Sequence, residues 1–401
     1  MKLSEDVSNR MLDKEVRKME SFDGRTDRRI RASGIEMLKI FAIFLIVISH
    51  VVLTLAGAGC EGIYRIDMTL ATTNLQYLFL SVLRYSGMLG NSIFFVCSAW
   101  FLQDMKKSNM KKLLHLWLEV WTVSVIILLA VLAVGDVHLG GLMILQCFMP
   151  NVFDNNWYIS CYMIFYLIVP LLNIVLEHLT QRQLLAFNLV TLILCSIKFI
   201  FMGIASPFNI NILALWIIFY FWISYLKRYM TESVSGKKCG YLCFAVGFVG
   251  CVGMIVAANY FGLSNGFFSS SLQRWNDSNN LFIILSAIGL LLIAKNIHIH
   301  SAVINEISSL SLLVYVIHEN ILLKKYYRPR MFEWLYATYG YDRIVLWVML
   351  FAIGIFTVSI LISFCYQQTV GRTLVRFENR IYPHLVIGWN RMLDVLEKVG
   401  N

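Results

Sequence analysis

The sequence predicts an all-α membrane protein of about ten transmembrane helices, with both ends of the chain in the cytoplasm. Of its 401 residues, 58% are hydrophobic and only 14% are charged, whereas a soluble domain carries roughly 25% charged residues. Its apolar runs reach about 18–25 residues, the length of a membrane-spanning helix, while the strands of a membrane barrel need only about ten. Helices satisfy their own backbone hydrogen bonds in lipid, so they fit this composition.

The apolar runs divide the chain into three parts. Residues 1–35 form a polar cytoplasmic tail, residues 36–368 form the membrane domain, and residues 369–401 form a second cytoplasmic tail. The second tail has apolar residues at helical spacing beside several arginines, which is typical of an amphipathic helix on the inner leaflet, and we expect Pro383 to interrupt it. The expected spans are 36–56, 77–103, 113–135, 156–177, 184–204, 210–228, 239–261, 281–297, 306–323 and 345–368.

The distribution of Lys and Arg sets the expected orientation. With the N-terminus inside, 24 of the 34 basic residues fall in cytoplasmic segments, 7 in outer segments and 3 within spans. This asymmetry follows the positive-inside rule. It also explains the net charge of +10 without a nucleic-acid partner. The exception is the outer segment 324–343, which holds five of the seven outer cations and is therefore either functional or a sign that the last two spans are misplaced.

The first span holds the most informative polar residues. Lys39 and His50 are eleven residues apart, so on a helix they share one face and lie about 16 Å apart along the axis. Lys39 would lie at the cytoplasmic mouth and His50 beyond the midplane. Titratable groups at such depth are costly and are commonly functional. The structural alternatives are that Lys39 extends to the inner headgroups and that His50 makes an interhelical hydrogen bond.

The ninth span carries a second polar stripe. Ser311, Tyr315 and His318 follow i, i+4, i+7 spacing, which places them on one helical face. His318 would lie about 18 Å from the inner end of its span, and His50 about 21 Å from the inner end of its own. We therefore expect the ninth helix to pack beside the first, with both histidines at one cavity. Two histidines, a Tyr and the Glu319 carboxylate at one depth could line a wet cavity, but Glu319 lies about 100° round the helix from His318 and is less expected to point into it.

Two further residues are candidates for the substrate cavity. Ser98 lies near the end of the second span, and Trp157 opens the fourth, where the alternative role is an aromatic anchor at the membrane surface. No segment has the pattern of a nucleotide-binding loop, a zinc site or a Ser-His-Asp triad. The histidines also lack metal-ligand spacing, so no metal site is expected.

Taken together, the motifs resemble acyltransferase family 3, the membrane O-acyltransferases, over about residues 36–323. The basic residue followed by ten residues and His50, after an acidic residue, is the most specific of them. Two departures are Lys39, where the family usually has Arg, and Ala99, where it often has Gly. Lys neutralises a phosphate but cannot form a planar bidentate clamp. The motifs that carry the resemblance are Gly34-Ile35-Glu36, Lys39 to His50, Phe94-Phe95 with Ser98-Ala99-Trp100, Asn156-Trp157-Tyr158 with Pro170, and Ser311 through Tyr315 to His318.

The resemblance implies transfer of an acyl group, commonly acetyl, from cytoplasmic acyl-CoA to a hydroxyl of a cell-surface or lipid-linked glycan at the cell membrane, with no bound cofactor. In this reading Lys39 binds the donor, and His50 is either the catalytic base or a transient acyl carrier. The alternatives are a polysaccharide flippase or polymerase, which should show many cations along a central cavity, and a proton-coupled transporter, which commonly shows broken helices in two related halves. Neither pattern is present in the sequence.

Overall fold

The structure consists of helices joined by short connections, and the described residues contain no strand. It is a computed structural model that describes residues 33–56, 71–153, 156–201, 211–231, 236–269, 272, 280–340 and 343–400. The polar tail expected at residues 1–35 therefore lies almost wholly outside the described residues. The helices are α2 (Ser33–Ala56), α3 (Leu75–Leu102), α4 (Met110–Val134), α5 (Gly141–Phe148), α6 (Trp157–His178), α7 (Gln181–Phe201), α8 (Ile212–Tyr229), α10 (Lys237–Gly262), α11 (Gly266–Ser269), α12 (Leu281–Lys295), α13 (Ala302–Ser309), α14 (Ser311–His318), α15 (Arg328–Tyr339), α16 (Ile344–Tyr366) and α17 (Arg372–Gly400).

Seven helices among the described residues are long and apolar enough to cross a membrane, so the chain is a multi-pass membrane protein. They are α2, α3, α4, α6, α8, α10 and the run that begins with α16. Two shorter apolar helices, Gln181–Ile197 and Leu281–Lys295, fall in the expected fifth and eighth spans. A bent pair, Ala302–His318 followed by Leu323–Tyr339, occupies the ninth. Within the described residues each of the ten expected spans thus falls mainly on helix, while seven helices are long and apolar enough to cross a membrane.

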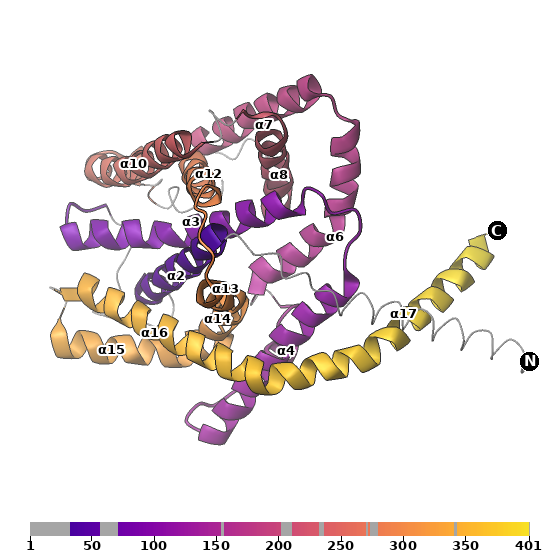
Figure 1. Cartoon of the computed structure of the whole chain (residues 1–401). Helices are drawn as coiled ribbons and strands as arrows, with labels where there is room; N and C mark the ends of the chain where they lie inside the picture. Colours follow the sequence, from indigo (N-terminus) through magenta and orange to yellow (C-terminus); the bar gives the residue numbers. More distant parts are fainter. Residues whose placement is uncertain are drawn as a thin grey trace, which may run out of the picture.

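Helix α2 lies at the centre of the bundle (Figure 1). It packs against α3 and α12 on one side and against α13, α14 and α16 on the other. Apolar residues of α2 contribute to two hydrophobic clusters, one shared mainly with α3, α8 and α12 and the other with α14 and α16. A helix in this position can bring side chains from both halves of the chain to one site.

Two glycines of α3 allow close contact with α2. A Cβ on Gly87 would lie 2.3 Å from the Oγ of Ser49, and one on Gly90 would lie 2.5 Å from the carbonyl oxygen of Ala42. Because small residues let helix backbones approach in membranes, the hydroxyl of Ser49 reaches across and donates to the carbonyl of Arg84 at 2.8 Å. This contact fixes the register of α3 against the part of α2 that precedes His50.

The N-terminal end of α2 is fastened to the segment before α14. The backbone N–H of Ser33 donates to the carbonyl of Ile299 at 3.0 Å. The Oγ of Ser308, on α13, donates to the buried carboxylate of Glu36 at 2.5 Å. These contacts tie the start of α2 to α13. Helix α2 also packs against α14 and α15, which follow α13 in the chain.

The ninth span differs from the helix expected over 306–323. It is interrupted at Leu310 between α13 and α14, and α14 ends at His318 with Glu319 at its C-cap. A five-residue π-helix, η4 (Leu323–Tyr327), then leads into α15 at an angle of 60° to the first part. Residues 324–339 of the basic segment are therefore helical and continue from α14 after a bend.

The C-terminal helix is longer than the sequence indicates. A second π-helix, η6 (Gln367–Gly371), joins α16 to α17, and α17 continues through Pro383. The expected interruption at Pro383 is wrong: the ring is accommodated within a helix that leaves the bundle (Figure 1). One polar contact ties α17 to α4, because Nδ1 of His115 lies 2.9 Å from the carboxylate of Glu378.

Candidate functional site

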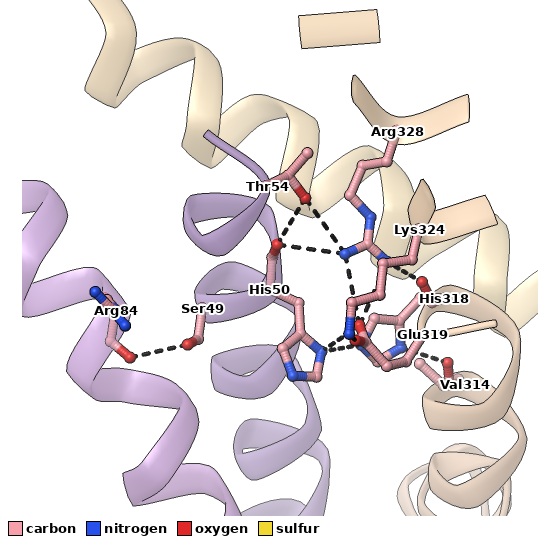
Figure 2. Close-up of polar contacts among 9 residues, drawn as sticks. All are labelled: Ser49, His50, Thr54, Arg84, Val314, His318, Glu319, Lys324 and Arg328. Carbon is pink, nitrogen blue, oxygen red and sulfur yellow. Dashed lines mark hydrogen bonds and ion pairs between the residues drawn. The ribbon is translucent and has the colours of Figure 1, made fainter. Parts of the chain in front are cut away.

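The two histidines identified in the sequence lie side by side. His50 projects from α2 and His318 from the last turn of α14, and Nδ1 of His50 lies 3.0 Å from Nε2 of His318 (Figure 2). This placement agrees with the matched depth expected for the two residues. His318 is buried, whereas the side chain of His50 keeps 17% of its surface accessible. His50 is therefore the member of the pair that a small molecule can reach.

The contacts of His318 determine which nitrogen of His50 carries a proton. Nδ1 of His318 lies 2.6 Å from the carbonyl oxygen of Val314, and a carbonyl only accepts, so this nitrogen is the donor. In the neutral ring Nε2 of His318 then has a lone pair facing Nδ1 of His50. Nδ1 of His50 lies between that lone pair and a carboxylate of Glu319 at 2.9 Å. Two acceptors assign the proton to Nδ1, which leaves Nε2 of His50 with a free lone pair.

Glu319 takes part in the site, and the expectation that it points away is wrong. The 100° argument assumes that the helix continues, but α14 ends at His318. Glu319 is the C-cap residue, and its side chain turns back towards α2 to reach His50. One N–H cannot point at both Glu319 and His318. The carboxylate is the stronger acceptor because it is charged, so the main partner of His50 Nδ1 is Glu319.

The Glu319 carboxylate is buried and shared by three positive or polar partners. One oxygen accepts from the Lys324 ammonium, and the other lies 2.9 Å from His50 and 3.5 Å from the Arg328 guanidinium. The side chains of Glu319 and Arg328 are each 5% accessible. A buried carboxylate without partners would cost several kcal/mol. These contacts stabilise the charged form at the position where it can act on His50.

Arg328 connects the ends of the two helices that carry the histidines. Its guanidinium donates to the carbonyl of His318 and, at 3.3 Å, to the carbonyl of His50. A further contact reaches the hydroxyl of Thr54 at 3.5 Å (Figure 2). Because these carbonyls lie near the C-terminal ends of their helices, the negative ends of the helix dipoles also stabilise the guanidinium charge. Sequence reasoning did not identify Arg328 itself; the signal was its membership in the outer basic segment that the positive-inside rule does not explain.

Tyr315 borders the histidine pair. Its ring centroid lies 6.4 Å from that of His50 and 5.9 Å from that of His318. On the other side the ring of Tyr158, at the start of α6, lies 6.4 Å from Tyr315. Trp157 is one residue further, 5.6 Å from Tyr158 between ring centroids, and it lines a small cavity between α3 and α8. The aromatic rings thus form a continuous row from Trp157 to His50.

The two serines expected at the cavity lie away from the histidines. Ser311 begins α14 and is buried, and its Oγ has no hydrogen-bond partner among the described residues. It is seven residues from His318, about 10 Å along the helix. Ser98 lies twelve residues beyond Ser86, whose hydroxyl donates to the carbonyl of Leu45. It is therefore about 18 Å along α3 from that contact, near the Lys39 end of α2.

Lys39 lies at the opposite end of α2 from His50. Its ammonium pairs with Glu36 at 3.2 Å and lies 5.5 Å from the ring of Phe101. Beside Phe101, the ring of Trp100 has two further ammonium groups over it, from Lys227 at 5.6 Å and from Lys295 at 5.2 Å. Cations from α2, α8 and α12 thus converge at the end of α3. One continuous helix connects this basic end to His50 over about 16 Å.

His50, His318 and Glu319 are also the described residues that can hold a metal ion, since their ligand atoms lie within 4.8 Å of one another. Helical spacing predicted that the two histidines share a cavity, but it did not place Glu319 with them, because α14 ends at His318. The carboxylate oxygens already contact Lys324 and Arg328. The side chains of both cations would have to move away before Glu319 could coordinate a divalent ion. The charges at this site therefore fit a hydrogen-bonded His–Glu pair better than a metal site.

Comparison with known proteins identifies one family. The family model described as an acyltransferase domain matches residues 33–366, which covers α2 through α16 and includes every residue of the cluster. No curated protein matches the chain, and no solved structure does.

The role of Arg328 leads to a stability prediction. Arg328→Ala removes the buried cation that contacts the Glu319 carboxylate and the carbonyls of His50 and His318, and breaking a buried charge pair costs about 3–5 kcal/mol. Thermal unfolding in detergent should show a large fall in midpoint. Arg328→Lys should recover only part of it, because Lys lacks the planar fork.

The matched control is Arg330→Ala. Arg330 pairs with Asp136 at 2.6 Å, but its side chain is 52% accessible, and such exposed pairs contribute about 0–1 kcal/mol. Equal midpoints for the two alanine variants would show that Arg328 does not hold the helix ends together.

Proposed function

Because the chain belongs to acyltransferase family 3, we propose that this membrane acyltransferase moves an acyl group, commonly acetyl, from cytoplasmic acyl-CoA to a hydroxyl of a cell-surface or lipid-linked glycan. The observation that carries the proposal is the free lone pair on Nε2 of His50, fixed by the Glu319 contact to Nδ1. A partly accessible imidazole with a buried carboxylate behind it is the arrangement that general base catalysis requires.

The proposed reaction places the acceptor hydroxyl and the thioester carbonyl beside Nε2 of His50. The hydroxyl oxygen attacks the carbonyl carbon while Nε2 takes the hydroxyl proton. Glu319 stabilises the imidazolium that forms, because its carboxylate faces Nδ1–H. The carbon–sulfur bond then breaks, and the CoA thiolate leaves and recovers the proton from Nε2. The products are an ester and free CoA thiol.

The alternative uses His50 as a transient acyl carrier. Nε2 then attacks the thioester itself, the carbon–sulfur bond breaks and CoA leaves as the thiolate. The acceptor hydroxyl next displaces the acyl group from the imidazolium, and its proton goes to the thiolate, so that the neutral imidazole, the ester and the CoA thiol result. The same lone pair serves both routes, so the geometry of the site fits either. An acylated His50 found by mass spectrometry after donor is added without acceptor would favour the carrier.

The donor is proposed to enter at the Lys39 end of the bundle. Lys39, Lys227 and Lys295 offer ammonium groups from three helices to the phosphates of CoA, and the rings of Trp100 and Phe101 lie between them. Phosphate binding by such groups is strengthened by charge. The flexible pantetheine arm would extend along α2 towards His50. His318 is proposed to orient the His50 ring, while Tyr315, Trp157, Ser98 and Ser311 would line the route or the acceptor cavity.

The proposed topology has ten spans with both termini in the cytoplasm of a cell-membrane protein. It is supported by the excess of Lys and Arg in the even-numbered connections. The seven long helices, the two shorter apolar helices and the bent pair together occupy the ten expected positions. In this arrangement Lys39 faces the cytoplasm, and His50 and segment 324–343 lie towards the outside.

The function is tested by His50→Ala. Loss of a general base or an acyl carrier should reduce acyl transfer by at least about two orders of magnitude, measured with radiolabelled acetyl-CoA and by the mass of the surface glycans. The matched control is His115→Ala, since His115 also contacts a glutamate but on α17, away from the cluster. Near-normal transfer by a folded His50→Ala protein would assign His50 to packing.

The donor site is tested at Lys39. Lys39→Ala should raise the KM for acyl-CoA about tenfold or more, the effect of losing a charged hydrogen bond, with a smaller change for the acceptor. Lys39→Arg should retain activity because it keeps the charge and adds donors. Lys238→Ala, which removes an exposed cation near the same end, is the control. Unchanged donor KM in Lys39→Ala would mean that Lys39 only anchors α2.

The topology is tested with reporter fusions. Reporters fused after residues 60, 150 and 270 should be active outside the membrane, and those after residues 108 and 232 should be active inside, because basic connections remain in the cytoplasm. Reversal at any two positions would contradict the ten-span arrangement.

A further inference from the structure

The outer end of the site carries a concentration of cations that the reaction described above does not use. Lys324 and Lys325 are consecutive residues of η4, and Arg330 lies in the first turns of α15. All three are exposed, with the side chains of Lys324 and Arg330 56% and 52% accessible. In the proposed topology they lie on the side of the membrane where the positive-inside rule disfavours them. A feature that opposes this rule needs another cause.

Lys324 joins this surface to the reacting histidine. Its ammonium contacts the outer oxygen of Glu319, whose other oxygen faces Nδ1 of His50. The lysine is half exposed although the carboxylate is buried, so it forms a side-chain connection from solvent to the site (Figure 2). A group bound at Lys324 would therefore lie next to Glu319, on the Nδ1 side of the His50 ring.

The neighbouring carboxylates pair with two of the three cations and leave Lys325 without a carboxylate partner among the described residues. Asp136, in the connection after α4, forms an ion pair with Arg330 at 2.6 Å and accepts a hydrogen bond from the Tyr327 hydroxyl at 2.6 Å. The Tyr327 hydrogen bond and Arg330 lower the pKa of the Asp136 carboxyl, so Asp136 is ionised at neutral pH. Lys325 lies 5.5 Å from the ring of Tyr326, and no carboxylate in the described part of the chain pairs with it. Glu319 is already shared with Arg328.

The local backbone places the two lysines. A π-helical turn adds one residue per turn to a helix, and such turns are frequent at functional sites. Here η4 follows the C-cap of α14 by four residues, so it presents Lys324 towards Glu319 and Lys325 beside it on the surface. An ordinary helical turn would place these side chains in a different direction from Glu319.

From these observations we infer that the acceptor is an acidic glycan, and that Lys324 and Lys325 bind a carboxylate or phosphate close to the hydroxyl that is acylated. This rests on the proposed function for the identity of the reacting hydroxyl. Binding of the anion at Lys324 draws the ammonium away from Glu319 and leaves the carboxylate to His50 and Arg328. A larger share of the Glu319 charge then acts on His50 when an acceptor is present, which limits transfer of the acyl group to water.

The inference is tested by binding in nanodiscs of phosphatidylcholine, with a glucuronate tetrasaccharide as the probe and its neutral methyl ester as the matched ligand. The acid should bind to the full chain, and the ester should bind at least about fivefold more weakly, the effect of one rim charge of roughly 1 kcal/mol. Lys325→Glu should abolish the difference. Lys107→Gln, which removes an exposed cation beyond the end of α3 that carries Phe101, should retain it. Higher salt should reduce acid binding in wild type.

Equal binding of acid and ester, or no binding of the acid, would overturn the inference. A second arm adds phosphatidylglycerol to the nanodiscs. If that lipid displaces the acid from wild type and from Lys107→Gln alike, or binds in its place through Lys325, the cluster recognises a lipid phosphate and an acidic acceptor is wrong. Transfer of labelled acetyl is measured separately. Transfer without acid preference would end only this inference, whereas acid binding without transfer to any acceptor would contradict the proposed function.

Discussion

The geometry of the site depends on one buried carboxylate. Glu319 lies at the point where α14 ends, and it is held there by Arg328 and Lys324 while it faces Nδ1 of His50. Each partner stabilises the ionised carboxylate in apolar surroundings, where an isolated carboxylate would cost several kcal/mol. Because the charge persists, the proton of His50 is fixed on Nδ1. The other nitrogen is left as the basic atom, and it points away from the cluster (Figure 2).

The central helix α2 connects this local arrangement to the opposite end of the bundle. Helix α2 carries Lys39 near one end and His50 near the other, and no break separates them. Its first turn is tied to α13 through Glu36 and Ser308, and its last turns are tied to α14 and α15 through Arg328. The segment from α13 to α15 therefore contacts both ends of α2. This connection suits the proposed reaction, in which the acyl donor binds at the Lys39 end and the acyl group is transferred at His50.

The sequence predicted those parts of the site that follow from helical regularity. Lys39 and His50 lie on one unbroken helix, and a constant rise of about 1.5 Å per residue gave the depths that matched His50 with His318. The regular period failed where the helix stopped: Glu319 was assigned to the wrong direction because the C-cap turns its side chain back. Arg328 could not be connected with His50 or His318 at all, since it returns across a 60° bend after a π-helix. Its only trace in the sequence was an excess of cations on the unexpected side of the membrane. Ser311 shares a helical face with His318, but it lies about two turns away along α14, and Ser98 lies nearer the Lys39 end of α2.

The most direct test of this account is the kinetic effect of Glu319→Gln, measured on protein whose thermal midpoint shows that it is folded. The substitution keeps the shape of the side chain and removes its charge, so Nδ1 of His50 loses its ionic partner and the ring can adopt the other tautomer. We predict a fall in kcat of at least about two orders of magnitude, as expected when a base loses its orienting carboxylate, with little change in the KM for acyl-CoA. A wild-type kcat in this variant would contradict the claim that Glu319 prepares His50 for proton transfer.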